Sequence, residues 1–219
     1  MRSLHFKQLS KNISAGQVRA AVTTGRYALT MQCHGCQQQL GPLVRADARY
    51  CSSKCRVAAH RRQPPAELRA LDRWVRFEKS KRPITVTGTA ASSTNTSTWS
   101  TFDEAQGTTI GAGFGFVLNG DGIVCVDLDH CIEHGRLLPW AADLLATCPA
   151  TFIELSVSGT GLHVWGRGDV TRGRKVTLED GGGIEVYGTS RYIAVTGRRW
   201  STSPARLGDL SEWLPGLAN

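Results

Sequence analysis

Apolar residues in the second half of the chain recur in short runs that turn residues separate. The clearest two runs are Gly115–Leu118 and Ile123–Val126, with Asn-Gly-Asp-Gly between them. Asn-Gly and Asp-Gly tolerate the positive φ angles of tight turns. The pattern therefore predicts two strands joined as a hairpin over Gly115–His130, and we expect the other elements to be arranged around it.

Strand patterns continue along the chain and predict two more hairpins. One joins Thr151–Val157 to Leu162–Gly166 through a Ser-Gly-Thr-Gly turn, and the other joins Gly182–Tyr187 to Arg191–Gly197. Leu137–Ala146 has the apolar spacing of a helix instead. Antiparallel strands with a few helices indicate an α+β fold in which the helices lie on one side of the sheet.

Helices are also expected before the first hairpin. Ala66–Val75 has apolar residues at helical spacing. Trp99–Ala105 has the pattern of a capped short helix, with Ser100 or Thr101 as its N-cap and acidic residues in its first turn. The Ser- and Thr-rich residues 85–98 lie between these segments. A loop of that length is often functional or mobile in a compact domain.

The two ends of the chain are patterned more weakly. Ser14–Val22 fits one short helix in a segment that carries no sign of chemistry. Residues 201–219 form a short tail. We expect three apolar side chains of this tail to pack back on the body of the protein: Leu210, Trp213 and Leu214.

The second strand of the central hairpin ends with two carboxylates on one face. Asp127 and Asp129 are two positions apart, so their Cα atoms are about 6.5 Å apart on the same side of the strand. Two such carboxylates repel each other and lose solvation unless a cation lies between them. Since hard divalent ions take oxygen ligands, we predict a catalytic metal site here.

Two other strands place polar groups on faces that are otherwise apolar or neutral. His163 shares a face with Trp165, and Glu185 shares a face with Tyr187. Three carboxylates suit two divalent ions, and a histidine suits the charge of a phosphate. Taken singly the signals are weak, because Asp-x-Asp is common, a lone strand histidine is more often a hydrogen-bonded core residue than a ligand, and a lone Glu185 fits a surface position. Their order, spacing and recurrent strand context favour metal-assisted phosphoryl or nucleotidyl transfer.

A separate metal-ligand pattern lies nearer the N-terminus. Cys33 and Cys36 form one close pair, and Cys51 and Cys55 form a second pair after 14 intervening residues. Four thiolates in two close pairs can close a tetrahedral zinc site. The second pair is at i and i+4 of a helix that begins near Cys51. Because so small a unit has little core of its own, bound zinc is expected to stabilise it.

The net charge of +8 is distributed unevenly. Residues 1–62 carry 11 Lys and Arg against one acidic residue, a net charge of +10, whereas residues 63–219 carry 15 against 17, a net charge of −2. A basic attachment on a near-neutral body is typical of a segment that binds a polyanion. On charge alone, a solvated tail is an equally good interpretation.

The composition also bears on the cellular compartment. The chain has no apolar run near 18 residues, and its first residues lack the apolar stretch of a signal peptide, so no membrane association is expected. The seven cysteines are an odd number without an export signal. They therefore indicate a reducing cytoplasm rather than a disulfide framework.

Three strand motifs carry a resemblance to a known family. They read Asp-Leu-Asp-His at 127–130, Ser-Gly-Thr-Gly-Leu-His at 158–163 and Ile-Glu-Val-Tyr at 184–187. These motifs resemble those of the archaeo-eukaryotic primase superfamily, and within it the bifunctional primase-polymerase (prim-pol) domain of phages and plasmids. Lys81–Pro83 and Arg191–Gly197 also fit, so the resemblance covers roughly residues 70–200.

The resemblance implies an RRM-like antiparallel sheet as the catalytic core. In that core Asp127, Asp129 and Glu185 would bind two Mg²⁺ or Mn²⁺ ions. His163 would contact the triphosphate of the incoming nucleotide. The implied activity is that of a DNA primase and polymerase, a nucleotidyltransferase that works on a single-stranded DNA template with NTP or dNTP substrates in phage or plasmid replication.

Further residues are assigned to the nucleotide on the same basis. Ser158 and the backbone of the Gly159–Gly161 turn would help cradle phosphate oxygens. Lys81 and Arg191 are candidates for phosphate or template contacts. The cysteine module would bind Zn²⁺ and hold the template by its phosphates.

These interpretations divide the chain into four parts. We expect an N-terminal extension at 1–32, a zinc finger at 33–62, a prim-pol catalytic domain at 66–200 and a C-terminal tail at 201–219. The chain has no Gly-x4-Gly-Lys-Ser/Thr loop, so a separate replicative helicase is the expected partner. The expected location is the cytoplasm, which is that of the bacterial host if a phage encodes the protein.

One departure from the family pattern supports a rival interpretation. The family often has a serine two residues before the motif histidine, where this chain has Gly161. The alternative is therefore a non-catalytic replication accessory protein that binds nucleic acid through a decayed primase core. A replication-initiator nickase is disfavoured because it would need a His-x-His pair, which the sequence lacks.

Overall fold

The computed structural model describes residues 33, 36, 38–41, 45, 47–179 and 181–218. The helix expected at Ser14–Val22 lies outside the described residues. The chain divides into two compact units, residues 1–56 and residues 57–219, and each is described by itself. Helix α1 (Ser53–Arg61) begins directly after Cys51 and Ser52, close to the predicted start.

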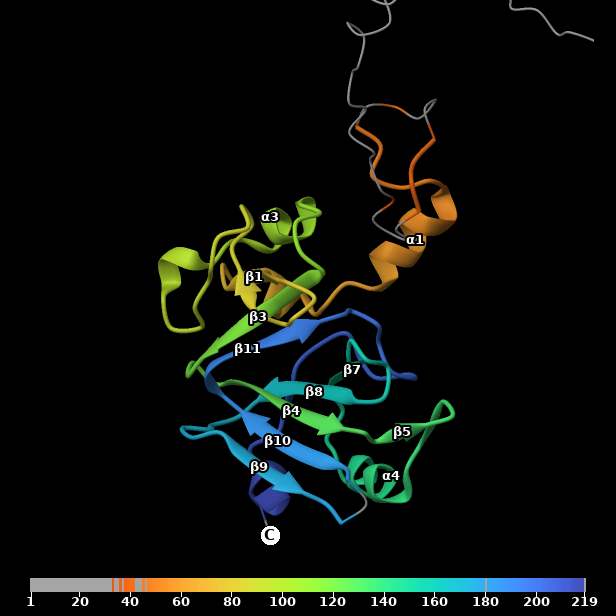
Figure 1. Cartoon of the computed structure of the whole chain (residues 1–219). Helices are drawn as coiled ribbons and strands as arrows, with labels where there is room; N and C mark the ends of the chain where they lie inside the picture. Colours follow the sequence, from red (N-terminus) through yellow and green to blue (C-terminus); the bar gives the residue numbers. More distant parts are fainter. Residues whose placement is uncertain are drawn as a thin grey trace, which may run out of the picture. The chain divides into compact units, whose positions relative to one another are not determined.

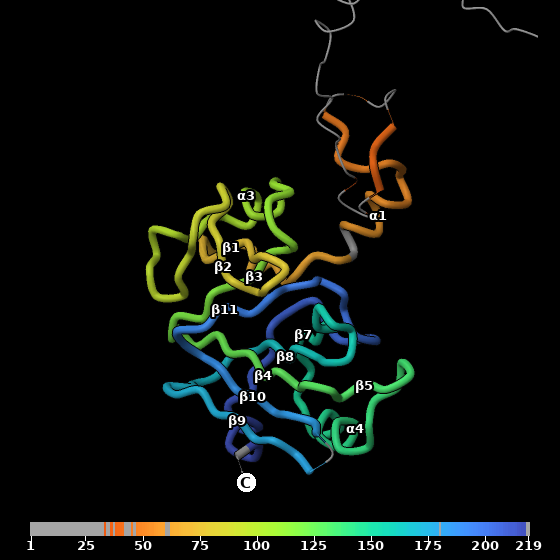
Figure 2. The backbone as a smooth tube through the Cα atoms, in the orientation of Figure 1, coloured from red at the N-terminus to blue at the C-terminus, as the bar shows by residue number. Residues whose placement is uncertain are grey.

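Two β-sheets form the larger unit (Figures 1 and 2). The first has the strand order β11-β3-β1-β2, and the second has the order β12-β8-β4-β10-β9 with β7 also paired to β8. The strands of the first sheet are β1 (Trp74–Phe77), β2 (Pro83–Ile84), β3 (Gly113–Asn119) and β11 (Thr189–Val195). Those of the second are β4 (Ile123–Asp129), β7 (Phe152–Leu155), β8 (Leu162–Arg167), β9 (Arg174–Thr177), β10 (Gly183–Tyr187) and β12 (Gly208–Asp209).

Short helices and one small hairpin complete the larger unit. The remaining elements are α2 (Ala66–Arg69), η1 (Thr96–Thr98), α3 (Phe102–Gly107), α4 (Pro139–Ala146), η2 (Leu214–Ala218) and the paired strands β5 (Ile132–Glu133) and β6 (Arg136–Leu137). The α+β class is therefore confirmed, but the single sheet with helices on one side is wrong. None of the described helices is long and apolar enough to span a membrane.

The hairpin predicted over Gly115–His130 is also wrong, because its two strands belong to different sheets. Strand β3 pairs with β1 and β11, whereas β4 pairs with β8 and β10. Both strands carry continuous buried runs, which is the pattern of a central strand with packing on each face. Arg73 holds the connecting turn through hydrogen bonds to the Asn119 and Asp121 side chains.

The hairpin predicted from Gly182–Tyr187 and Arg191–Gly197 is wrong for the same reason. Strand β10 pairs with β4 and β9, and the chain then crosses to the other sheet, where β11 pairs with β3. At Gly188 an added Cβ would lie 2.5 Å from the Val170 carbonyl oxygen, so only glycine fits the crossing. The two connections between the sheets, β3 to β4 and β10 to β11, lie side by side, since the Gly120 amide donates to the Gly188 carbonyl at 2.9 Å.

Helix caps and short turns near the middle of the chain predicted the structure better than the strand pairings did. Helix α3 has Thr101 as its N-cap, in a capping box with Glu104. The β7–β8 hairpin and α4 form where they were predicted. The helix expected over Ala66–Val75 ends instead at Arg69, because the fully buried Trp74 begins β1 and its indole donates to the Leu68 carbonyl at 3.2 Å.

Buried side chains form one cluster on each face of the six-stranded sheet. The first lies between this sheet, α4 and the C-terminal segment; its strand residues are Val124, Val126, Leu128, Leu162, Val164, Ile184 and Val186. The second joins the two sheets; its members include Trp74, Phe116, Cys125, Phe152 and Trp165. Since side chains alternate along a strand, the central strands β4 and β8 contribute to both clusters.

The tail packs on the body as expected. Leu210, Trp213 and Leu214 are buried in the first cluster, and Leu210 is fully inaccessible to solvent. Leu210 lies directly on β8, where a Cβ added to Gly166 would be 2.4 Å from its Cγ atom. The close contact with the strand backbone means that a smaller side chain would leave a cavity.

This packing gives a stability prediction. Leu210→Ala is expected to lower the free energy of unfolding by about 2–5 kcal/mol, since it removes buried methyl groups that the sheet cannot collapse around. Ile110→Ala, at a side chain that is 40% exposed, is the control and should change it by no more than about 0.5 kcal/mol. Urea denaturation followed by circular dichroism measures both, and equal effects would contradict the buried position of the tail.

Candidate metal and nucleotide site

Five ionisable residues form one row across the six-stranded sheet. Strand register places Glu154 opposite His163, His163 opposite Asp127, Asp127 opposite Glu185, and Glu185 opposite Lys175. All five side chains therefore project from the same face of the sheet. Asp127 stands at the centre of the row because β4 is the middle strand.

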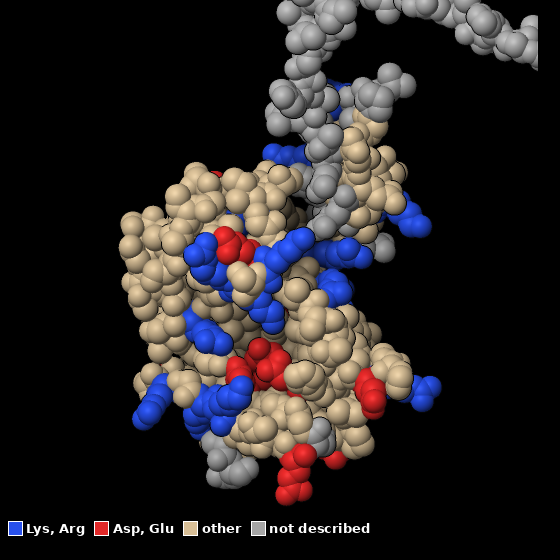
Figure 3. All heavy atoms as spheres, viewed as in Figure 1, with Lys and Arg blue, Asp and Glu red and all other residues tan. Residues whose placement is uncertain are grey.

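The row borders an apolar row on the same face. This apolar row is displaced by two residues along each strand and consists of Phe152, Trp165, Cys125 and Tyr187. The first three are fully buried under the four-stranded sheet. On the opposite side of the charged row lies the half-buried Asp129. The carboxylates thus lie where a dry core meets the surface, and the space-filling view shows acidic side chains over β4 and β10 with basic ones beside them (Figure 3).

The structure brings together the three carboxylates that the sequence singled out. Ligand oxygens of Asp127, Asp129 and Glu185 all lie within 4.8 Å of one another. Burial raises the pKa of Asp127 to about 6, and the charges of Asp129 and Glu185 act in the same direction. The Oδ1 atom of Asp127 is buried without a hydrogen-bond partner. An orphaned oxygen among clustered carboxylates fits a divalent cation with oxygen ligands.

Glu185 has two partners that the sequence did not indicate. Lys175 of β9 donates to Oε1 of Glu185, and the Tyr187 hydroxyl donates to Oε2. Burial acts to raise the pKa of Glu185, but these hydrogen bonds outweigh it and hold the pKa below its ordinary value. Glu185 is therefore ionised at neutral pH and available as a ligand.

His163 lies between two carboxylates. Its Nδ1 atom is 3.3 Å from Oε1 of Glu154, and its Nε2 atom is 3.7 Å from Oδ1 of Asp127. Burial acts to lower the pKa of His163, but the hydrogen bond with Glu154 and the nearby negative charges raise it overall. Glu154 was missed because a single acidic residue in an apolar strand carries no motif signal.

The two basic residues predicted to contact phosphate or template come from elements of the four-stranded sheet. Lys81 is exposed in the turn between β1 and β2, where its carbonyl accepts a hydrogen bond from the Tyr192 hydroxyl, and its charge lowers the pKa of Asp127. Arg191 is exposed on β11, with its guanidinium 4.8 Å from the ring centroid of Tyr187. Both residues therefore lie close enough to influence the acidic centre.

The turn before β8 explains the glycine in the second motif. A Cβ added to Gly161 would lie 2.7 Å from the Leu128 carbonyl oxygen, so no serine fits there. The Ser156 hydroxyl accepts a hydrogen bond from the Gly161 amide at 3.2 Å instead. Ser158 is exposed, and its hydroxyl lies 2.9 Å from the hydroxyls of both Ser156 and Thr160. Three hydroxyls thus line this turn.

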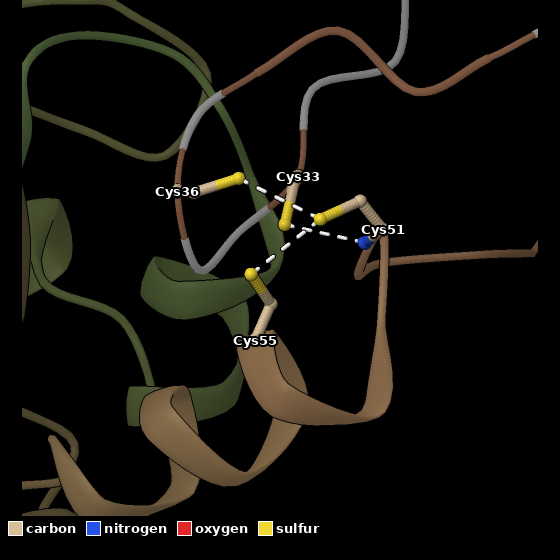
Figure 4. A group of neighbouring side chains, drawn as sticks. All are labelled: Cys33, Cys36, Cys51 and Cys55. Carbon is tan, nitrogen blue, oxygen red and sulfur yellow. Dashed lines mark hydrogen bonds between the residues drawn. The ribbon is translucent and has the colours of Figure 1, made fainter.

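The four predicted cysteines also lie together (Figure 4). Cys55 projects from α1, Cys51 precedes that helix, and their sulfurs are 3.4 Å apart, while Cys36 Sγ is 3.6 Å from Cys51 Sγ. The Cys51 amide donates to Cys33 Sγ at 3.3 Å. Zn–S bonds of about 2.3 Å in a tetrahedron require sulfurs about 3.8 Å apart, which is close to these separations.

The pKa of Cys51 also bears on whether the cluster binds a metal ion. Hydrogen bonding with Cys55, Cys33 and Cys36 raises the pKa of Cys51 to about 12. The Cys51 thiol thus resists ionisation by itself. A bound cation reverses this preference, because metal-coordinated thiols are deprotonated. The donor set and its spacing therefore fit Zn²⁺.

Comparison with known proteins adds an independent finding. No protein-family model matches the chain. The DNA primase-polymerase of Nitratiruptor phage NrS-1 is 37% identical to it over 145 residues, which cover 59% of this chain and 20% of the phage protein. The chain thus spans about a fifth of the length of this curated relative. The match confirms the resemblance to phage primase-polymerases that the three strand motifs predicted.

The cysteine cluster gives a second prediction. The wild-type chain is expected to purify with about one Zn²⁺ per molecule, and Cys51→Ser is expected to lose it, since three thiolates no longer close the tetrahedral shell. The control is Cys148→Ser, at a half-buried cysteine that is not in the cluster. Inductively coupled plasma mass spectrometry measures the zinc. Full occupancy in the Cys51 variant would rule out this ligand set.

Proposed function

We propose that the chain is a DNA primase-polymerase that performs template-directed nucleotidyl transfer on single-stranded DNA with NTP or dNTP substrates. One observation carries the proposal. Asp127, Asp129 and Glu185 converge to within 4.8 Å on one sheet face, in a chain that is 37% identical over its aligned region to a phage protein named as a DNA primase-polymerase.

The carboxylate cluster is the proposed metal centre. Asp127, Asp129 and Glu185 would hold two Mg²⁺ or Mn²⁺ ions. When bound, such ions lower the pKa of an attacking 3′-hydroxyl and neutralise charge on the leaving pyrophosphate. The protein's own contribution is to fix the three carboxylates by strand register and to keep Glu185 ionised through Lys175 and Tyr187.

The cationic and hydroxyl-bearing groups around the centre are proposed to bind the nucleotide. His163 would contact the triphosphate through Nε2, which already faces the centre at 3.7 Å from Asp127. Ser158 and the turn to Gly161 would offer hydroxyl and amide donors to phosphate oxygens. Lys81 and Arg191 would contact phosphate or template, because both are exposed and influence the carboxylates electrostatically.

The remaining assignments follow from the same function. We assign residues 66–200 to an RRM-like catalytic core, in which β4, β8 and β10 form the sheet and α4 packs behind it. Residues 33–62 are assigned to a zinc finger that holds the template through its basic residues. Residues 1–32 are an N-terminal extension and residues 201–219 a tail. A separate helicase in the bacterial cytoplasm would supply unwound template.

Nucleotide incorporation tests the proposal. Wild-type protein with single-stranded DNA, labelled nucleotides and Mg²⁺ or Mn²⁺ is expected to synthesise product. Asp129→Ala should lower the rate by about 100-fold or more, because a metal ligand contributes several kcal/mol to transition-state stabilisation. Asp143→Ala, at an exposed carboxylate of α4, is the matched control and should retain the rate.

Two results would contradict the proposal. Full activity of the Asp129 variant would show that the carboxylate centre is not catalytic. Metal-independent binding of single-stranded DNA by wild-type protein, with no incorporation of any nucleotide, would favour the non-catalytic replication accessory protein. Circular dichroism of each variant separates loss of function from loss of fold.

A further inference from the structure

Glu154 is a fully buried carboxylate to which the proposed reaction assigns no role. It lies on β7 at the end of the charged row, with none of its surface exposed to solvent. A buried carboxylate is costly unless several hydrogen bonds compensate for its lost hydration. Its position therefore requires either a structural or a functional explanation.

One oxygen of this carboxylate is held by the backbone after β11. Oε2 accepts hydrogen bonds from the Gly197 amide at 2.6 Å, from the Thr196 amide at 3.0 Å and from the Thr196 hydroxyl at 3.1 Å. Gly197 has φ 62° and no room for a side chain, since an added Cβ would meet the backbone of Arg62. Because the Thr196 and Gly197 amides belong to a closely packed backbone, they hold the Glu154 carboxylate in one orientation.

The other oxygen faces two aromatic side chains of β8. Oε1 accepts a hydrogen bond from the Trp165 indole at 3.1 Å and lies 3.3 Å from Nδ1 of His163. A carboxylate accepts hydrogen bonds and donates none, so the partner nitrogen of His163 must carry the proton. The second ring nitrogen, Nε2, is then the atom turned toward Asp127 and the metal centre, at 3.7 Å.

We propose that Glu154 is a positioning residue that holds the His163 ring by its Nδ1–H group, so that Nε2 is presented to the incoming nucleotide. The inference rests on the proposed function for the identity of the ligand. The underlying chemistry is general, because a carboxylate behind a functional histidine selects the proton position and the ring orientation. Glu154 thus acts through His163 and does not touch substrate.

A purely structural role would give different consequences from a positioning role. If Glu154 only accepted the hydrogen bonds of Thr196, Gly197 and Trp165, its loss would destabilise the fold without changing the protonation or orientation of the His163 ring. In Glu154→Gln the carbonyl oxygen must remain with the two backbone amides. The new NH2 group then takes the place of Oε1, where it faces the Trp165 indole N–H and Nδ1 of His163. The hydrogen bond to His163 is thereby reversed, so that Nδ1 becomes the acceptor and the ring keeps a proton on Nε2 alone.

The decisive experiment combines kinetics with a double-mutant cycle. Glu154→Gln, His163→Ala and the double variant are assayed for KM and kcat of nucleotide incorporation. Glu154→Gln is expected to raise KM for the nucleotide by about tenfold, at the lower end of the 10- to 100-fold range for loss of such a carboxylate. In the His163→Ala background the same change should raise KM by less than about twofold, since coupled residues are not additive.

A second measurement is independent of catalysis. Nitrogen-15 NMR of the wild-type histidine rings is expected to show a proton on Nδ1 of His163, and Glu154→Gln should remove it. Thr196→Val is the control: it removes a hydroxyl that bonds the other oxygen of Glu154, the Leu155 carbonyl and the Arg198 amide, and leaves Oε1 of Glu154 facing His163, so the Nδ1 proton should stay in place.

The outcomes separate this inference from the proposed function. An equal rise in KM in both backgrounds, or a neutral wild-type ring with its proton on Nε2, would overturn the positioning role even if the enzyme is active. Absence of all nucleotide incorporation would refute the proposed function. The NMR result on wild-type protein would still decide whether Glu154 sets the His163 ring.

Discussion

The fixed register of β4 between β8 and β10 is the constraint on which the candidate site depends. Asp127 is flanked by His163 and Glu185 only because these strands pair as they do. A slip of one residue would turn the charged groups into the cluster beneath the sheet and bring valines and leucines to the surface. The apolar residues on both faces of β4 make such a slip costly, so packing far from the carboxylates holds them in place.

The chemistry of the site follows from where this packing ends. The row formed by Phe152, Trp165 and Cys125 is dry, and the adjacent row is charged. Asp127 is therefore largely shielded from water, and an added cation stabilises it more than it would in bulk solvent. Lys81 and Arg191, from elements of the four-stranded sheet, add positive charge near this centre, beside His163 and Lys175 of the six-stranded sheet.

Sequence reasoning succeeded where a signal was local and failed where it depended on pairing. The capping box of Thr101, the β7–β8 hairpin, the two cysteine pairs and the Asp127–Asp129 pair are encoded in short spacings, and the structure brings the side chains of each pair close together. The pairing partners of β3 and β4 are not encoded in this way, because an apolar strand followed by a tight turn is compatible both with a hairpin and with a connection between two sheets. Glu154 was missed for a related reason, since its importance arises from contacts with residues 163, 165, 196 and 197, which only the folded chain brings together.

The central claim is that Asp127, Asp129 and Glu185 jointly hold catalytic divalent ions. Its most direct test is a crystal structure grown with Mn²⁺ and a non-hydrolysable nucleoside triphosphate, with data collected at the manganese absorption edge. The account predicts anomalous density between the three carboxylates, with the triphosphate on the side of His163. Manganese bound elsewhere, with the carboxylate cluster lacking anomalous density in the nucleotide-bound protein, would contradict it.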